Sequence, residues 1–436
     1  MSTAAVEPVL PDSTTDRLPP FVRRVRIRGY KSIEFCDVEL EPLTILVGPN
    51  GAGKSNFLDA LGFVRDALAI NLTEAINRHG QWRGILSRFN STNEVSIQLE
   101  LAMPNSRLDI AEGLETFVAT YGITLGQGLD EYSPIVAQEF FLPLSGTAAG
   151  NRPRFERRTW VEGDRIAASW KSSPPINQLK EGTPWPDRLW LDKWDPGIPF
   201  LSHWVDGLRF MSLYNFVPAE IRKLQLADSS PLLESDGRNL ATMMERIRRI
   251  DPATAERISA FLSAIVPEID HFHEVTLGDY RTLRFWLRAQ PLLEFDASSM
   301  SDGTLRALAT LVAAYQMQRP WGPSLVGIEE PETALHPAAM SALVGALDET
   351  TLRTQIILTT HSAEMLDNPT IQPGNVRVVQ MVDGRTRIGT VDAASVEIVR
   401  RNLNTLGGLE RENQLERDDD DQLRQQKLAS ANGEPQ

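Results

Sequence analysis

The sequence has 436 residues, of which 42% are hydrophobic and 23% charged, and 44 Lys and Arg against 58 Asp and Glu give a net charge of −14. This composition is typical of a globular protein, and the length is too great for one compact core. The single cysteine, Cys36, excludes an intramolecular disulfide framework and a cysteine-based zinc site. We find no secretory signal and no apolar run long enough to span a bilayer, so the expectation is a cytoplasmic protein without a membrane segment.

Residues 1–20 are rich in Pro, Ser and Thr, which predicts a disordered leader. Order is expected to begin at Phe21, where apolar residues alternate with Arg24, Arg26 and Arg28 as in a half-buried strand. We favour a solvent-exposed basic face on this strand over a surface that binds nucleic acid. The apolar segment 43–47 predicts a buried strand that leads into a glycine-rich turn and a helix.

The turn itself, Gly48–Ser55, reads GPNGAGKS and matches the phosphate-loop pattern between a predicted strand and a predicted helix. Glycines let backbone N–H groups face phosphate oxygens, Lys54 is expected to reach the β- and γ-phosphates of ATP, and Ser55 to bind Mg²⁺. The competing interpretation, an ordinary glycine turn before a helix, does not require the lysine and serine. The residues expected to contact ATP here are Asn50, Gly51, Ala52, Gly53, Lys54, Ser55 and Asn56.

A second candidate element, 324–331, is an apolar strand that ends in two acids. We expect Glu329 to hold Mg²⁺ and Glu330 to act as general base on the attacking water. Acids often end strands on solvated loops, so this pattern is informative because it accompanies a phosphate loop.

Between these elements lies a segment that is harder to interpret. Helices are predicted over 239–250 and after Asp251-Pro252, and His271 and His273 are expected on one face of a strand, where a metal site is not favoured. The densest basic stretch, with two tryptophans that could stack on bases, makes DNA an alternative partner, although nearby acids dilute its charge. It contains Arg152, Arg154, Arg157, Arg158, Arg165, Trp160 and Trp170.

Two further segments are each unremarkable alone: Ser301-Asp-Gly-Thr begins a predicted helix, and His361 follows the strand predicted at 355–359. In this order they resemble the signature motif and switch histidine of ABC-type ATPases. The phrase IEEPETALHP at 328–337 resembles the SMC/Rad50/RecF-like branch, in the AAA_21-type ATPase group related to overcoming-lysogenization-defect (OLD) proteins. The segment IRGYKS at 27–32 is similar to that group's opening strand, where Lys31 and Ser32 lie near the nucleotide.

The resemblance implies an α/β fold, an ABC-type ATPase head with a mixed sheet and flanking helices. Its expected parts are an N-terminal lobe at 21–100, an ordered, partly helical insertion at 101–290 that serves as lid or dimerisation lobe, a C-terminal lobe at 291–408 and an acidic disordered tail at 409–436. The family's Q-loop glutamine is not located, since Gln81 and Gln98 fit it equally poorly.

The resemblance also implies a head-to-head homodimer, or a higher homo-oligomer, that sandwiches ATP. His361 would contact the γ-phosphate in its own chain, whereas Ser301, Asp302 and Gly303 would contact the nucleotide held by the partner subunit.

The function implied is a Mg²⁺-dependent ATP-hydrolysing switch. About 40 residues follow the last predicted strand, too few for the TOPRIM domain that relatives carry, so we expect a separate effector, a TOPRIM- or HNH-type nuclease in antiphage defence. A RecF-like DNA clamp and a slow ATP-dependent scaffold are the alternatives.

Overall fold

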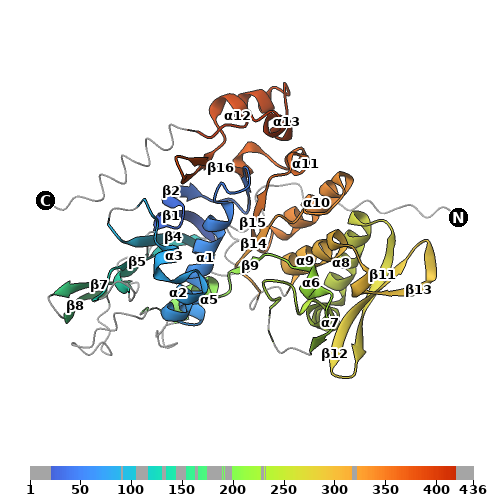
Figure 1. The fold of residues 1–436 in the computed structure, drawn as a ribbon, viewed down its shortest axis with the longest axis horizontal. Coiled ribbons are helices and arrows are strands. Elements are labelled where there is room, and N and C mark those ends of the chain that lie inside the picture. Colours follow the sequence, from blue (N-terminus) through green and yellow to red (C-terminus); the bar gives the residue numbers. More distant parts are fainter. Residues whose placement is uncertain are drawn as a thin grey trace.

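The computed structural model describes residues 21–89, 92–104, 116–129, 134–143, 154–162, 165–173, 189, 191, 199–226, 230, 232–316 and 322–418. Figure 1 shows a long molecule with an antiparallel sheet on one side and a helical part on the other. Within these ranges no helix is long and apolar enough to cross a membrane. The expected leader, 1–20, lies outside the described residues.

A six-stranded sheet in the order β17–β16–β3–β15–β14–β9 forms the centre of the molecule. The two apolar segments predicted beside the phosphate loop and the paired acids are its strands β3 and β14, and β3 is buried throughout, as a strand covered on both faces must be. Neighbours from β9 to β16 run parallel, so their carboxyl ends meet at one edge, while β17 returns antiparallel. The strands are β3 Leu43–Val47, β9 Ser212–Tyr214, β14 Leu325–Glu329, β15 Gln355–Thr360, β16 Val376–Val382 and β17 Arg385–Thr390.

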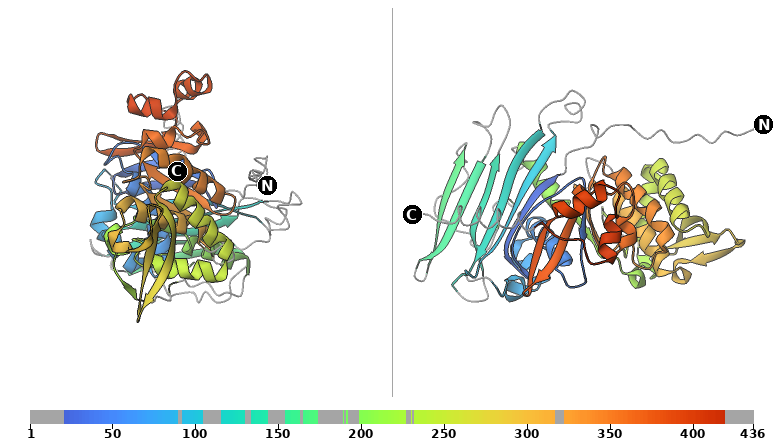
Figure 2. Two further views of the ribbon diagram at one scale, coloured as in Figure 1. Left: turned by 90° about the vertical axis from the view of Figure 1, so that its right-hand side faces the viewer. Right: turned by 90° about the horizontal axis from the view of Figure 1, so that it is seen from above.

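A seven-stranded antiparallel sheet lies at one end of the molecule (Figure 2, right). Its order is β2–β1–β4–β5–β6–β7–β8. On β1 the predicted alternation is confirmed: Val25 and Ile27 are buried, whereas Arg24 and Arg26 bind Asp37 of β2 rather than an external partner. The strands are β1 Val22–Tyr30, β2 Ile33–Glu39, β4 Val95–Pro104, β5 Thr116–Gly126, β6 Ile135–Pro143, β7 Arg154–Glu162 and β8 Arg165–Ser173.

Helix α1 (Lys54–Ala69) lies between the two sheets. Its apolar residues Phe57, Leu61 and Val64 are fully buried in a core cluster that includes residues of both sheets. Helices α2 (Leu72–Arg78) and α5 (Pro199–Arg209) pack on it, and α3 (Gln81–Ile85) packs on α2. This packing fixes the start of α1, and therefore the phosphate loop, against the central sheet.

The other face of the central sheet is covered by a helical layer. The predicted helix start at Asp251 is confirmed, since its side chain accepts a hydrogen bond from Thr254 N (3.1 Å) and Pro252 occupies the first helical position. A small sheet projects from this layer, and His271 and His273 lie on one face of its strand β11, as expected. The elements are α6 Pro218–Ile221, α7 Leu240–Ile250, α8 Pro252–Ile265, α9 Asp302–Tyr315 and α10 Met340–Thr350, with β10 Gln225–Leu226, β11 Ile269–Leu277, β12 Tyr280–Leu287 and β13 Gln290–Asp296.

Two predicted boundaries differ from the structure. The segment 101–290 is not one inserted lobe: β5–β8 extend the antiparallel sheet, β9 returns to the central sheet, and only the part from α6 onward belongs to the helical layer and its small sheet. The tail predicted from residue 409 is structured as far as Asp418, because α13 (Leu406–Arg411) packs on α11 (Ala363–Leu366) and Arg417 forms a β-bridge with Val391. Residues 419–436 lie outside the described part.

Candidate active site

The phosphate loop joins β3 to α1 and contains three glycines with positive φ, namely Gly48 at 152°, Gly51 at 78° and Gly53 at 104°. A Cβ atom at Gly48 would overlap the carbonyl oxygen of Val379, and one at Gly53 would overlap the side chain of Thr386. The loop is therefore pressed against β16 and β17, and at these two positions both the backbone conformation and the space require glycine.

The tip of the loop faces solvent. Asn50 and Gly51 are exposed, and Ser55 at the first turn of α1 is exposed as well, whereas Ala52 is buried beneath them. The loop therefore presents the start of α1, with its unpaired N–H groups, at an accessible edge of the sheet.

The side chain of Lys54 folds back over the loop. Its ammonium donates hydrogen bonds to the carbonyl oxygens of Gly48 (2.6 Å) and Pro49 (3.1 Å), which use two of its three donors. Burial lowers the pKa of the Lys54 ammonium below its ordinary value, and nearby carboxylates oppose that shift. These carboxylates belong to Glu330, Glu332, Glu410 and Glu329.

Ser55 and Glu329 meet where α1 begins and β14 ends. The hydroxyl of Ser55 donates a hydrogen bond of 2.7 Å to Oε2 of Glu329. Mg²⁺ prefers oxygen ligands and usually keeps several waters or phosphate oxygens in its shell, so a hydroxyl and a carboxylate at one exposed point fit this ion. In the described ranges no group of three or more His, Cys, Asp or Glu is placed to hold a metal.

Glu330 follows the strand in a strained conformation. Its φ is +44°, and its N–H donates to the carbonyl oxygen of Thr359 on β15 (3.0 Å). Non-glycine residues with positive φ cost on the order of 1–3 kcal/mol and often occur at functional sites. Nδ1 of His361 lies 3.5 Å from Oε1 of Glu330, and both side chains are partly exposed. The side chains of Glu330 and His361 therefore both lie at an accessible surface close to the phosphate loop.

Sequence reasoning did not identify Glu332 as part of this group. It is 7% exposed, and its Oε1 accepts a hydrogen bond of 2.5 Å from the hydroxyl of Thr360. Burial raises the pKa of Glu332 above its ordinary value, against the hydrogen bond from Thr360. In the sequence, the one indication of this role was that Glu332 stands two residues after Glu330, in the turn that follows β14 at the edge where β14 pairs with β15.

An amide at the same edge was also missed. Strand β9 pairs in parallel with β14, with Tyr214 opposite Ile328, so the exposed Asn215 that follows lies at the carboxyl edge beside the two acids. The two glutamines considered from sequence lie elsewhere: Gln81 begins α3, and Gln98 pairs with Arg26 in the antiparallel sheet.

The segment Ser301–Gly303 begins α9 as predicted. The hydroxyl of Ser301 accepts a hydrogen bond from Thr304 N (3.1 Å), and the carboxylate of Asp302 pairs with Arg222. A Cβ at Gly303 would overlap the carbonyl oxygen of Ala334, so this helix start packs against the loop after the paired acids. These partners lie outside the phosphate loop.

The residues of the opening strand are placed differently from expectation. Nζ of Lys31 pairs with Asp59 on α1 rather than pointing to the phosphate loop, because Asp59 offers a partly buried carboxylate beside it. Ser32 instead supports the loop from behind: its hydroxyl contacts Thr386 Oγ1 (2.6 Å), which donates to the carbonyl oxygen of Ala52 (2.9 Å). Asn56 donates to the same serine hydroxyl (2.6 Å).

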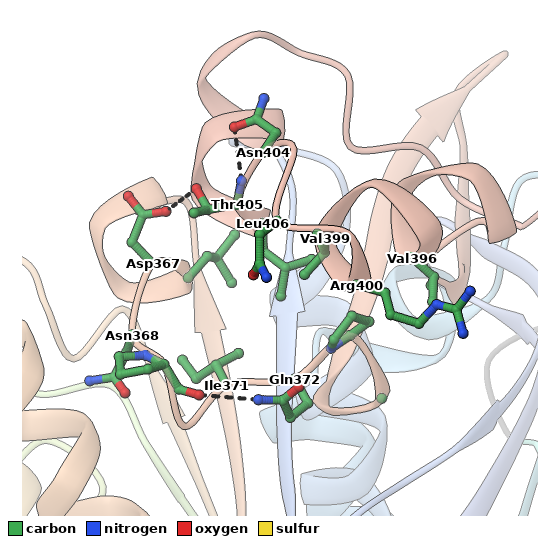
Figure 3. A pocket seen from close by; sticks show the side chains of 15 residues that line it. Asp367, Asn368, Ile371, Gln372, Val396, Val399, Arg400, Asn404, Thr405 and Leu406 are labelled. Carbon is green, nitrogen blue, oxygen red and sulfur yellow. Dashed lines mark hydrogen bonds between the residues drawn. The ribbon is translucent and has the colours of Figure 1, made fainter.

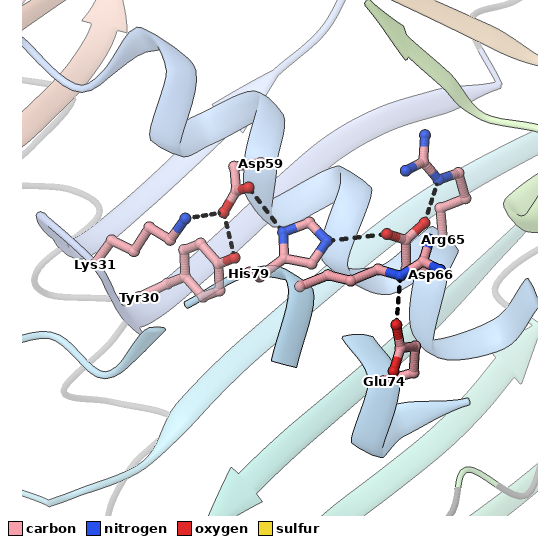
Figure 4. A network of polar contacts seen from close by, with 8 residues as sticks. Tyr30, Lys31, Asp59, Arg65, Asp66, Glu74 and His79 are labelled. Carbon is pink, nitrogen blue, oxygen red and sulfur yellow. Dashed lines mark hydrogen bonds and ion pairs between the residues drawn. The ribbon is translucent and has the colours of Figure 1, made fainter. Parts of the chain in front are cut away.

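Lys31 belongs to a polar network at the base of α1 (Figure 4). His79 bridges two acids, with Nδ1 2.7 Å from Asp59 Oδ1 and Nε2 3.2 Å from Asp66 Oδ2. Burial alone would lower the pKa of His79, but its hydrogen bonds to the two carboxylates outweigh that effect and raise it. Although burial opposes it, the hydrogen bonds from His79 and Arg65 lower the pKa of Asp66 to about 2. The network fastens α2 to α1.

The basic residues that the sequence offered for DNA binding lie in different environments in the structure. Arg157 is 1% exposed and forms a buried ion pair with Glu139 (3.3 Å), so it is unavailable to an external ligand. Arg158 pairs with Glu156, whereas Trp160 is 45% exposed on the same strand. Arg152 and the side chains of Arg154, Arg165 and Trp170 lie outside the described residues.

Comparison of the sequence and the fold with known proteins finds related chains. Residues 43–108 and 285–367 match a family described as "AAA domain, putative AbiEii toxin, Type IV TA system". The chain is 21% identical over 365 residues to the Old nuclease of Escherichia phage P2, covering 78% of this chain and 56% of that protein. It is 23% identical over 356 residues to the OLD nuclease of Thermus scotoductus, covering 79% and 60%. The chain thus spans little more than half the length of these relatives.

Among solved structures, the Smc head domain of Pyrococcus furiosus, in complex with the C-terminal domain of ScpA, superposes with a TM-score of 0.50 at 12% identity. The match covers 88% of this chain and 99% of that one. The shared feature is the fold.

Proposed function

We propose that the chain is an SMC/Rad50/RecF-like ABC-type ATPase related to the OLD proteins, that it hydrolyses ATP with Mg²⁺, and that it works as a nucleotide-driven switch. The observation that carries this proposal is the meeting of Lys54, Ser55, Glu329, Glu330 and His361 at the carboxyl edge of the central sheet. Ligands of open α/β sheets bind at that edge.

The nucleotide's phosphates bind to the loop amides of 50–56 and to Lys54. Ser55 and Glu329 hold Mg²⁺, which neutralises charge on the phosphate oxygens. Glu330 takes the proton of the attacking water, and His361, beside it, donates a hydrogen bond to the γ-phosphate. Ser32 and Asn56 act indirectly, by fixing the loop through Thr386 and Ala52.

Ser301, Asp302 and Gly303 complete the site of a second copy. Ser301 and Asp302 are exposed at the N-terminus of α9, and their hydrogen-bond and ion-pair partners lie outside their own phosphate loop, which supports a role across a head-to-head dimer. ATP then favours the closed pair and hydrolysis reopens it.

The effector controlled by this switch is a nuclease on a separate chain, of TOPRIM or HNH type, acting in antiphage defence. The names of the two curated relatives, both nucleases, support the nuclease part of this proposal. The alternative of a DNA clamp loses support from the buried Arg157–Glu139 pair and from the pairing of Arg24 and Arg26 with Asp37.

The test is the solution mass of Glu330→Gln protein by light scattering, with and without Mg²⁺–ATP. The variant should be monomeric alone and dimeric with ATP, and Lys54→Ala should remain monomeric in both. A mass that is already dimeric or larger without nucleotide would contradict the ATP-driven dimer and favour the slow scaffold. Hydrolysis that rises steeply with DNA and falls with salt would favour the clamp.

A further inference from the structure

One arginine fastens the start of α9 to the segment that follows β9. Arg222 ends α6, and its Nη2 donates a hydrogen bond of 2.8 Å to the carbonyl oxygen of Met300. The same nitrogen pairs with the carboxylate of Asp302. Met300 and Asp302 flank Ser301 in the sequence. The arginine therefore holds both the peptide before Ser301 and the side chain after it.

The backbone of Arg222 is fixed by its surroundings. Its N–H donates to the carbonyl oxygen of Pro218 (3.0 Å), which closes the single turn of α6. The residue before it, Ile221, is 1% exposed and belongs to the same core cluster as Leu305 of α9. The guanidinium therefore reaches the start of α9 from a backbone that packs in the same core as that helix.

The pair between Arg222 and Asp302 lies at the surface of the molecule. The side chain of Asp302 is 55% exposed and that of Arg222 is 28% exposed. Ion pairs with this exposure contribute little to the stability of a fold. The pair therefore matters less for folding than for the charge that it leaves at the start of α9.

Asp302 without its partner would place a negative charge in the first turn of α9. The N-terminus of a helix attracts anions through its unpaired N–H groups and its dipole, and a carboxylate in the first turn competes for that attraction. The carboxylate would also repel a phosphate that approached the same turn. The guanidinium of Arg222 neutralises this charge and leaves the start of α9 able to accept an anion.

We propose that Arg222 is a positioning residue for the segment Ser301–Gly303: it neutralises Asp302, so that the first turn of α9 can accept the γ-phosphate of ATP bound to a second copy of the chain. This inference rests on the proposed head-to-head dimer and adds a residue on which that dimer depends. The partners of Arg222, Met300 and Asp302, lie outside the phosphate loop of their own chain. Loss of Arg222 should therefore weaken dimerisation and leave the binding of ATP to a single chain unchanged.

The experiment measures ATP-dependent dimerisation in the Glu330→Gln protein, which is expected to bind ATP and to hydrolyse it slowly. Sedimentation equilibrium with saturating Mg²⁺–ATP gives the dimer dissociation constant of this parent and of versions that also carry Arg222→Gln, alone or with Asp302→Asn. Arg222→Gln should weaken the dimer roughly five- to thirtyfold, since a symmetric dimer contains the contact twice. Addition of Asp302→Asn should restore the dimer to within about threefold of the parent, because no unpaired carboxylate then remains.

Arg400 provides the matched control. It lies on α12 (Ala393–Arg400), away from α9 (Figure 1), and lines a cavity of about 700 Å³ (Figure 3). Because it pairs with the carboxylate of Glu397 (2.7 Å), Arg400→Gln breaks another exposed arginine–acid pair. Dimerisation of this version should stay within about twofold of the parent. Titration with a fluorescent ATP analogue, at protein concentrations too low for dimers, should give affinities within about twofold of one another for all versions.

Three results would overturn the inference: a dimer that Arg222→Gln leaves unchanged, a weakened dimer that Asp302→Asn does not restore, or an equal loss of ATP affinity in the monomer. The second result would mean that the arginine acts only by holding the backbone at Met300. A parent protein that binds ATP and stays monomeric would instead reject the proposed dimer, and the inference with it.

Discussion

Ser55 and Glu329 are joined by a hydrogen bond of 2.7 Å although 274 positions separate them in the sequence. The contact exists because β14 and β3 both pair with β15, which brings the end of β14 and the start of α1 to the same edge. The Ser55 hydroxyl and the Glu329 carboxylate are thereby held side by side, as the proposed Mg²⁺ site requires.

Removal of either ligand should show as a changed requirement for metal. We expect Ser55→Ala and Glu329→Gln to raise the Mg²⁺ concentration for half-maximal ATP hydrolysis, roughly ten- to a hundredfold, since each removes one of the two protein oxygens. Mg²⁺ titrations of steady-state phosphate release measure this. An activity reduced at every Mg²⁺ concentration with an unchanged midpoint would argue against metal binding by these residues.

Substitutions of Lys54 and of Glu330 should impair ATP hydrolysis at different steps. Lys54→Ala removes the loop cation and should abolish nucleotide binding, and turnover with it. Glu330→Gln keeps the size of the side chain but removes its basicity, so it should bind ATP and turn over roughly 10²- to 10⁴-fold more slowly. Nucleotide binding and phosphate release, measured on the same preparations, separate the two effects.

Glu41→Gln, an exposed acid in the turn before β3, is the control for both variants and should behave as wild type. Steady-state hydrolysis by Glu330→Gln at the wild-type rate would falsify its role as the general base.

The elements that could be predicted from sequence are those specified locally. The buried strand β3, the glycine pattern at 48–55 and the apolar strand ending in two acids each carry their signal within a few residues, and all three are found where they were expected. The helix caps at Asp251 and Ser301 are local as well, since each side chain binds a backbone N–H three residues ahead.

The parts that could not be predicted depend on contacts between distant segments. Strand β9 has three residues, too few to show a period, and Asn215 reaches the site edge only because β9 pairs with β14. From sequence, Lys31 could be expected to pair either with a bound phosphate or with a carboxylate of the protein. It pairs with Asp59 because α1 packs against β1, and this packing cannot be read from the sequence. The end of the described chain joins the fold because α13 packs on α11, a contact between distant segments that no pattern in the polar tail indicates.

The three loop glycines should differ in their tolerance of alanine. At Gly51 a Cβ meets no described atom within 4 Å, so Gly51→Ala carries only the cost of a positive φ, about 1 kcal/mol. At Gly53 the new methyl group meets the buried side chain of Thr386, and at Gly48 it meets the backbone of Val379, which cannot rotate away.

The expected order of thermal destabilisation is therefore Gly48→Ala, then Gly53→Ala, then Gly51→Ala, with the first costing more than about 3 kcal/mol. Thermal unfolding of the three variants measures it. An equal loss in all three would mean that backbone conformation alone, and not the contact with β16 and β17, decides the need for glycine.

The network around His79 should make stability depend on pH. The folded-state pKa of His79 is raised by its bonds to Asp59 and Asp66, so its stabilising effect is complete below the unfolded value of about 6.5 and is lost as pH rises through the folded value. Asp66, whose pKa is lowered to about 2, contributes in the opposite sense: its effect is present above about 3.9 and is lost as pH falls toward 2.

Measurements between about pH 5 and 9 therefore isolate the histidine. His79→Gln should lower the unfolding free energy by about 1–3 kcal/mol near pH 6, and by less near pH 9, because wild type loses the protonated bridge at the higher pH. His271→Gln, which changes an exposed histidine on β11, is the control and should leave the stability difference small throughout. A His79→Gln deficit that stays constant or grows with pH would show that the bridge between the two acids is made by the neutral imidazole.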